Sequence, residues 1–530
     1  MKTLSIILFT ISFAFISSAQ DTKVVFLKEG TKQVQSVDYS QFVSQRSIER
    51  RKRQGIGFNE LDAPVNKEIL SDLSAEGQIK NASKWLNAVA LNTSTSVEEL
   101  LAKYDFIERI QVVKHSKSTS IDKFANDTKS LNYGMAINQV EQLNLDCLHD
   151  MGYTGSGVYL AVIDAGFRNM DTIAYFDSVY LENRVLDEFN FVSNNTTIYG
   201  SSGHGTAVSS CIVGEKVAPL EYAGTGVDVD LALYLSEDVS SETEIEEFYL
   251  VTALERADSV GIDVVNISLG YFEYDDSTET HLYSDLDGLT TISAVGVNVA
   301  ATKGIFVANS AGNSGPSNIS TPCDAIGSFC VGAVNEQGDL AGFSSLGPAA
   351  DGRVKPDVVA RGQDTWLIGQ SGQLGQSNGT SFSSPVLAGA AACLIQANPN
   401  RTVQEVMDAI RESASQFNNP DEFKGYGIPD FCVANDILSD DTGLEDFNDE
   451  NLLVYPVPAS DVVFIAGLPT SDTDVSISIY NSLGELVLID EVSVSNEQLE
   501  LNINKLSNGL YTLVIDQGNV QARKNLSIIK

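Results

Sequence analysis

Val158-Tyr-Leu-Ala-Val-Ile163 is a nearly continuous apolar run, which is typical of a strand buried on both faces of a parallel sheet. Residues 244–257 place their larger apolar side chains roughly on one face, which predicts an amphipathic crossover helix. Strands that alternate with helices predict an α/β fold with a doubly wound, mostly parallel sheet. Apolar runs similar to the first recur at residues 231–235, 262–267, 304–308 and 330–334.

Polar side chains follow three of these runs, where strands are expected to end. Asp164 follows the first run, Ser268 follows the run at 262–267, and Asn313 lies shortly after 304–308. In doubly wound sheets, ligands gather at the carboxyl ends of the strands. We therefore expect a functional site at this edge of the sheet.

Three short segments supply an acid, a base and a nucleophile. A serine hydroxyl becomes a good nucleophile when a base takes its proton, and the base needs a third group to hold its tautomer. The chain has four histidines, of which only His204 lies between glycines at an expected helix start, so His115, His149 and His281 are interpreted as surface or core residues. We assign Ser381 as nucleophile, His204 as base and Asp164 as orienting carboxylate. The segments are Val162-Ile-Asp164-Ala-Gly166, Gly203-His204-Gly-Thr206 and Asn378-Gly-Thr-Ser381.

These motifs, in the order Asp, His, Ser, resemble those of the subtilisin-like (subtilase) serine proteases over roughly residues 131–435. The resemblance implies a secreted serine endopeptidase that hydrolyses peptide bonds of proteins through an acyl-enzyme intermediate. Ala207 stands where many subtilases carry a second histidine, but that position is outside the triad. The expected peptidase domain spans residues 131–438.

Two further segments resemble parts of the subtilase site. Ala311-Gly-Asn313 resembles the segment whose asparagine side chain stabilises the oxyanion beside the Ser381 N–H, with Asn309 as a nearby alternative. Asn266-Ile-Ser268-Leu269-Gly270 resembles the segment that pairs with the substrate backbone and walls the primary specificity pocket. The resemblance thus implies that Ser268, Leu269 and Gly270 bind substrate.

The resemblance implies no required cofactor. Many subtilases hold structural calcium, and the chain has carboxylates to spare, but no dense Asp-x-Asp loop identifies a calcium site. No CxxC pair indicates zinc. Structural calcium is therefore an expectation without assigned residues, and no metal ligands are assigned.

The N-terminus has the composition of a secretory signal peptide. Lys2 is followed by the apolar residues 4–16 and then by Ser17-Ser18-Ala19, so we expect residues 1–19 to be removed by cleavage after Ala19. The alternative is a membrane anchor, but about thirteen apolar residues are short for the ~20 that span a bilayer. We find no other membrane-spanning candidate in the sequence.

Residues 20–130 are predicted to contain a small α+β fold and a cleavage linker. The fold resembles the subtilase propeptide, which implies that it acts as an intramolecular inhibitor. Runs at 23–27 and 85–91 are β-like, a helix is expected around residues 44–54, and the polar tract 115–130 is the expected cleavage linker. We interpret the cluster Arg50-Arg51-Lys52-Arg53 as a solvated basic loop.

The negative charge lies almost entirely after this segment. Residues 21–130 contain 17 lysines and arginines against 15 acidic residues, whereas residues 131–530 contain 15 against 56. The chain as a whole has a formal net charge of −38. Such an acidic protein is not expected to bind nucleic acid or an anionic membrane surface.

The C-terminal part is predicted to be a separate β-sandwich at 451–530, preceded by an acidic linker at 439–450. Tyr455-Pro-Val-Pro-Ala459, Leu506-Ser-Asn-Gly-Leu-Tyr511 and the final residues 525–530 resemble the C-terminal sorting domain of the type IX secretion system of Bacteroidota. Val457 departs from the usual asparagine of the first motif. The resemblance implies export by the type IX machinery to the cell surface or medium; the alternative is a generic carbohydrate- or protein-binding module.

Six cysteines are compatible with an exported protein, and they allow fifteen complete disulfide pairings. Cys323 and Cys330 bracket a short loop and are our disulfide candidate. Cys211 and Cys393 lie in apolar helical stretches and are interpreted as free buried thiols.

Two other functions compete with a broad digestive endopeptidase. One is a non-catalytic surface adhesin on a subtilase scaffold, against which the complete set of Asp164, His204, Ser381 and Asn313 argues. The other is a processing protease that acts on few partner proteins, and the sequence does not separate it from a digestive enzyme.

Overall fold

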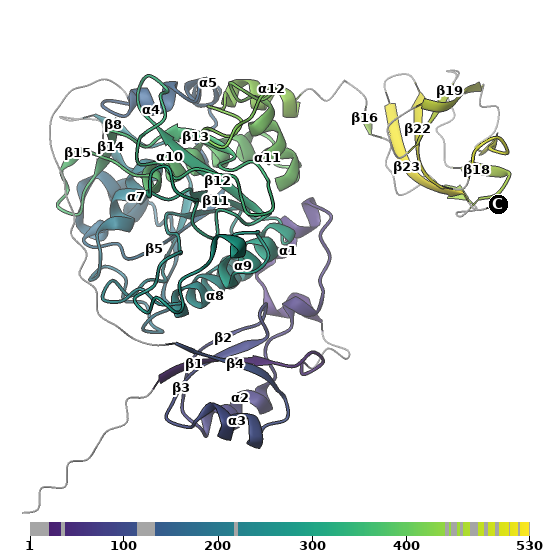
Figure 1. The fold of residues 1–530 in the computed structure, drawn as a ribbon. Helices are drawn as coiled ribbons and strands as arrows, with labels where there is room; N and C mark the ends of the chain where they lie inside the picture. Colours follow the sequence, from purple (N-terminus) through teal and green to yellow (C-terminus); the bar gives the residue numbers. More distant parts are fainter. Residues whose placement is uncertain are drawn as a thin grey trace, which may run out of the picture. The chain divides into compact units, whose positions relative to one another are not determined.

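A computed structural model gives the chain as two compact units, Met1–Leu438 and Ser439–Lys530 (Figure 1). The predicted signal peptide and cleavage linker lie outside the described residues, as does most of the acidic linker. The structure describes residues 21–32, 38–113, 133–216, 221–439, 445–446, 453–455, 459–466, 475–481, 486–492, 498–507, 509–517, 520–528 and 530.

The first unit is built around a parallel sheet of seven strands in the order β13-β12-β11-β10-β5-β9-β6. The predicted doubly wound parallel sheet is therefore confirmed. The apolar runs at 158–163, 231–235, 262–267, 304–308 and 330–334 fall in or beside its strands, whereas β6 and β13 were not predicted. The strands are β5 Tyr159–Asp164, β6 Val185–Asn190, β9 Asp230–Leu235, β10 Val264–Ile267, β11 Phe306–Ser310, β12 Ser328–Val334 and β13 Val358–Arg361.

Alternate residues of each central strand pack on opposite faces of this sheet. In β5, Leu160 and Val162 belong to one apolar core, and Ala161 and Ile163 belong to another. Helices α7 and α10 contribute to the first core, and α8 and α9 to the second. The longer helices of the unit are α7 His204–Val213, α8 Ile245–Val260, α9 Ile292–Thr302, α10 Thr380–Ala397, α11 Val403–Glu412 and α12 Phe431–Ser439.

Shorter elements surround this layered core. Two antiparallel pairs, β7 with β8 and β14 with β15, connect the larger elements. These elements are α4 Ile137–Glu141, α5 Asp146–Asp150, α6 Asp177–Leu181, β7 Glu215–Lys216, β8 Tyr222–Ala223, β14 Thr365–Ile368 and β15 Leu374–Ser377.

Residues 21–113, here called the pro-region, form a four-stranded antiparallel sheet in the order β2-β3-β1-β4. Val24 and Phe26 of β1 face the core that contains α8 and α9, whereas Val25 and Leu27 face a separate core with α2 and α3. The predicted α+β character is confirmed. The elements are β1 Asp21–Leu27, α1 Gln45–Arg53, α2 Lys67–Ser74, β2 Gln78–Ser83, β3 Ala88–Thr93, α3 Val97–Lys103 and β4 Ile107–Val113.

The pro-region explains why α8 is buried almost all round instead of being amphipathic. The sheet covers one side of the helix and the pro-region the other, so acidic residues such as Glu255 and Asp258 are buried. Glu255 accepts hydrogen bonds from the backbone N–H groups of Lys84 and Trp85. Burial of this helix therefore depends on the pro-region.

The interpretation of Arg50-Arg51-Lys52-Arg53 as a solvated loop is wrong. The cluster lies in α1, and the side chains of Arg50 and Arg51 are fully buried against α8. Both contact the carboxylate of Asp258, and Arg51 also contacts Asp62. Buried acidic partners thus compensate the charges that would otherwise require solvent.

Two disulfides are present, and two cysteines are free. Cys323 is joined to Cys330, and Cys147 of α5 is joined to Cys432 of α12, a pairing that the sequence did not suggest. Cys211 and Cys393 are buried free thiols in α7 and α10. Helix α10 has the length and composition of a membrane span, but most of it is buried within the unit, as in the core helix of a soluble protein.

The second unit contains a five-stranded sheet, β16-β23-β22-β19-β20, and a three-stranded sheet, β17-β18-β21. One apolar core joins them, with Val463 and Leu501 from the smaller sheet and Ile477 and Leu513 from the larger. This is the predicted sandwich. Its strands are β16 Glu445–Asp446, β17 Leu453–Tyr455, β18 Val462–Ala466, β19 Val475–Asn481, β20 Leu486–Val492, β21 Gln498–Asn502, β22 Gly509–Gln517 and β23 Val520–Ile528.

Candidate active site

Asp164 and His204 are in direct contact at the carboxyl edge of the central sheet. Asp164 is the last residue of β5 and its side chain is fully buried, while His204 is the first residue of α7. The Nδ1 atom of His204 lies 2.8 Å from Oδ1 and 3.0 Å from Oδ2 of Asp164. The N–H of Ala165 donates to Oδ1 at 2.7 Å. A buried carboxylate on Nδ1 leaves the opposite ring nitrogen, Nε2, to exchange a proton.

Gly205 allows this close approach of α7 to the end of β5. Its N–H donates to the carbonyl oxygen of Gly166 at 2.9 Å. A Cβ atom at position 205 would lie 2.7 Å from that oxygen and 3.0 Å from Cβ of Asp164. A side chain there would therefore force the base away from its carboxylate.

Ser381 is the second residue of α10, and only 9% of its surface is exposed. Gly379 precedes the helix with a φ of +156°, which L side chains rarely adopt. The ring of Phe382 lies against that of His204, with 5.9 Å between centroids. This contact brings the first turn of α10 beside the base.

Hydrogen bonds join the first turn of α10 to the end of β10. The hydroxyl of Ser381 donates to the carbonyl oxygen of Ser268 at 3.3 Å, and the hydroxyl of Ser268 donates to the carbonyl oxygen of Ser381 at 2.9 Å. Asn266 accepts from the hydroxyl of Ser384 and donates to that of Ser268. These hydrogen bonds thus hold the backbone at Ser268 next to the side chain of Ser381.

Asn313 and Asn309, the two oxyanion candidates, have different surroundings. Asn313 is exposed, and its Oδ1 accepts from the N–H and the hydroxyl of Thr380 at 2.8 and 3.0 Å. Its Nδ2 is therefore the donor that the side chain can offer to a ligand. Asn309 is fully buried in β11, where its Nδ2 donates to the carbonyl oxygens of Leu269 and Ser310. The surroundings favour Asn313.

Ser268, Leu269 and Gly270 form a wall shared by two adjoining cavities. One cavity, of about 740 Å³, contains Ser381, and the other, of about 560 Å³, contains His204. Asn313 lines both. Apart from the buried Asp164, which contacts His204, the predicted catalytic, oxyanion and substrate-binding residues therefore line these two cavities, here called the cleft. A Cβ atom on Gly270 would lie 2.1 Å from the hydroxyl of Ser320 in the wall of the larger cavity.

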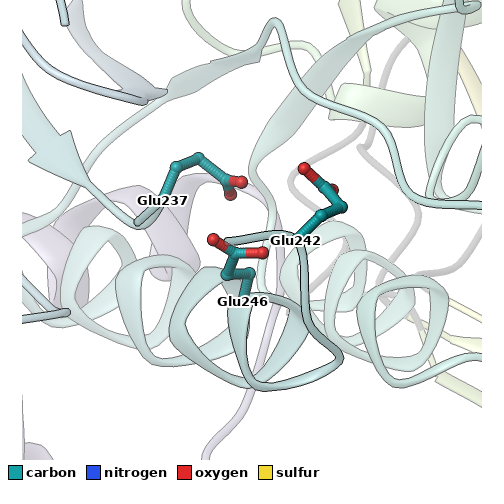
Figure 2. A group of neighbouring side chains, drawn as sticks. All are labelled: Glu237, Glu242 and Glu246. Carbon is teal, nitrogen blue, oxygen red and sulfur yellow. The ribbon is translucent and has the colours of Figure 1, made fainter. Parts of the chain in front are cut away.

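An acidic cluster borders this cleft. It consists of Glu237, Glu242 and Glu246, whose side chains lie close together (Figure 2) and provide oxygens within 4.8 Å of one another. Burial raises the pKa of all three, to about 8 for Glu237, about 7 for Glu242 and about 10 for Glu246. Mutual repulsion adds to the shifts of Glu237 and Glu246, and repulsion from Asp275 adds to that of Glu242.

The acidic cluster is a poor match to a calcium site. Both carboxylate oxygens of Glu246 already accept backbone N–H groups, from Asp238 and Thr243. One oxygen of Glu237 accepts from the hydroxyl of Tyr271. Calcium takes six to eight oxygen ligands, and few oxygens of the cluster are left for it.

Sequence reasoning missed this cluster and also Thr380, which holds Asn313. A signal for the cluster was present, because Glu237 and Asp238 follow the apolar run at 231–235 after a single serine. The Thr380 contact gives no signal in the sequence, because its partner lies 67 residues away.

Three family models match successive parts of the chain. The model of the subtilase family matches residues 155–427. A model described as the peptidase S8 propeptide domain of Bacteroidota matches residues 22–129. A secretion system C-terminal sorting domain matches residues 453–530.

Characterised relatives include several subtilisins. The chain is 31% identical to subtilisin of Bacillus pumilus over 296 residues, which cover 54% of this chain and 94% of the relative. It is 28% identical to subtilisin E of Bacillus subtilis (strain 168) over 374 residues, which cover 69% and 85% of the two chains.

Similar solved structures include the prenylagaramide maturation protease PagA, with 21% identity and a TM-score of 0.44, covering 56% of this chain and 98% of that one. MycP1 from the ESX-1 type VII secretion system has 20% identity and a TM-score of 0.46, covering 61% and 91%.

Proposed function

Since the chain belongs to the subtilase family of serine proteases, we propose that it is an endopeptidase that cleaves proteins through Ser381, His204 and Asp164. The observation that carries this proposal is the contact of His204 with the buried Asp164, beside the helix turn that bears Ser381. The shared wall at Ser268, Leu269 and Gly270 directly follows strand β10 and lines both cavities, and we infer that its backbone pairs with an extended peptide.

In the proposed reaction, Ser381 Oγ attacks the scissile carbonyl carbon while His204 Nε2 takes the hydroxyl proton. The carbonyl π electrons move to oxygen, and the resulting oxyanion accepts hydrogen bonds from the Ser381 N–H and Asn313 Nδ2. Collapse of this intermediate expels the amine, which receives the proton from His204. Water then hydrolyses the acyl-enzyme by the same steps and restores Ser381. Asp164 holds the ring tautomer and stabilises the imidazolium.

The protein is secreted through its C-terminal sorting domain. The pro-region matches a family propeptide domain, and we infer that it inhibits the enzyme until cleavage in the tract 115–130 releases it. The comparisons give no support to a non-catalytic adhesin. Broad cleavage of unfolded casein would favour a digestive enzyme over a processing protease that acts on few partner proteins.

A fluorophosphonate probe tests the nucleophile. We expect the intact mass of the matured protein to rise by one adduct, and we expect Ser381→Ala to abolish the adduct. Ser383→Ala is the matched control, because Ser383 is buried in the same helix turn and donates to the carbonyl oxygen of Thr380. An adduct that survives Ser381→Ala, or a matured wild-type protein that forms none, would refute the proposal.

A further inference from the structure

Glu242 lies where the two cavities of the cleft adjoin. It lines the cavity that contains Ser381 and also the cavity that contains His204. Both cavities share the wall at Ser268, Leu269 and Gly270. The side chain is therefore placed to contact a peptide that occupies the cleft.

The carboxylate of Glu242 differs from its two neighbours in its contacts. Glu246 is held by backbone N–H groups, and Glu237 accepts from the hydroxyls of Tyr271 and Ser236. Among the residues that the structure describes, none donates a hydrogen bond to the Glu242 carboxylate or forms an ion pair with it, and only burial and Asp275 shift its pKa. Figure 2 shows this carboxylate near those of Glu237 and Glu246.

Two other buried carboxylates of the first unit have a cation beside them. Glu247 contacts His281, and Asp357 contacts both Lys355 and Arg411. In the described part of the chain, the acidic cluster has no such cation, while Glu273 and Asp275 add negative charge to the wall of the larger cavity. Carboxylates that are buried beside one another without a cation take up protons, and a positive group from outside would favour their charged form instead.

We propose that Glu242, backed by Glu237, forms a subsite for the positively charged side chain of a lysine or arginine in the substrate. This inference rests on the proposed function, because the subsite lies in the same cleft. The wall at 268–270 is expected to bind the residues on the acyl side of the scissile bond. The basic residue therefore belongs on that side.

A basic side chain suits the cluster better than a metal ion. A guanidinium or ammonium group needs a few hydrogen-bond acceptors on one side, and a free carboxylate such as that of Glu242 supplies them. Calcium would need most of the oxygens that backbone N–H groups and Tyr271 already occupy.

The test compares matched peptides on the matured enzyme. Internally quenched peptides carry arginine or its neutral isostere citrulline at each of the four positions on the acyl side. We expect kcat/KM to favour arginine by at least about tenfold at one position, as for a charge-assisted hydrogen bond. Glu242→Gln should bring this ratio close to one. The control Asp276→Asn removes a neighbouring charge that lines neither cavity, and it should preserve the ratio.

Each contrary outcome has a distinct meaning. Equal cleavage of arginine and citrulline peptides at all four positions would overturn the subsite while leaving the endopeptidase intact. A protein that cleaves no peptide would overturn both proposals. If a chelator removed the arginine preference from the wild-type enzyme and calcium restored it, the cluster would be a metal site and the subsite would be refuted.

Discussion

Arg50 of the pro-region donates a hydrogen bond of 2.6 Å to Asp258 of α8, and both side chains are fully buried. Arg51 contacts the other oxygen of the same carboxylate and also Asp62, which in turn accepts from Lys303. The pro-region is therefore joined to the peptidase domain by a buried ionic network in addition to the apolar contacts of its sheet.

Asp258→Asn should destabilise the precursor strongly. The substitution removes the negative charge that both buried arginines contact. Loss of one partner of a buried ion pair lowers the free energy of unfolding by about 3–5 kcal/mol. The free energy of unfolding can be measured by denaturant titration in the Ser381→Ala background, which prevents autolysis.

Lys52→Ala is the control for that experiment, because Lys52 is exposed on the same helix. We expect this substitution to change the free energy of unfolding by less than about 0.5 kcal/mol. A loss of similar size in both variants would show that the network does not hold the pro-region.

Asn313→Asp should lower kcat by about 10²–10³-fold with little change in KM, because it removes the Nδ2 donor. The new carboxylate can still accept from Thr380, as Oδ1 does now. Steady-state kinetics of Asn313→Asp and Asn313→Ala distinguish two roles. If only Asn313→Ala were impaired, Asn313 would position Thr380 and would not stabilise the oxyanion.

The triad could be proposed from sequence because each member lies in a short motif at a strand end or helix start. The Arg50–Asp258 pair could not, because its partners are 208 residues apart and a run of basic residues normally indicates solvent exposure. Helix α8 was predicted to be amphipathic, but the pro-region covers its second side, so the helix is buried on nearly every side. The acidic cluster depends on the turn between β9 and α8, which brings Glu237 back beside Glu246.

Stability should fall as the pH rises from about 5 to 8. The pKa values of Glu237 and Glu242 are raised to about 8 and about 7, from 4.5 in the unfolded chain. Between the unfolded pKa of 4.5 and the folded values of about 7 and about 8, the folded protein binds more protons than the unfolded one. The free energy of unfolding therefore decreases as the pH rises through this range. We expect Glu242→Gln to reduce this decrease, measured as Tm across the pH range in the Ser381→Ala background. If Tm of Glu242→Gln fell with pH as steeply as Tm of the control Asp276→Asn, the prediction would be contradicted.

The disulfide between Cys147 and Cys432 should contribute more to stability than that between Cys323 and Cys330. The first closes a loop with a sequence separation of 285 residues, the second one of only 7, and the entropy removed from the unfolded chain increases with loop length. Replacement of Cys147 and Cys432 by serine should lower the free energy of unfolding by about 2–4 kcal/mol or more. Denaturant unfolding of the two double-serine variants measures the difference. An equal or larger loss from the short loop would show that native-state contacts around Cys323 and Cys330 outweigh the entropy of the unfolded chain.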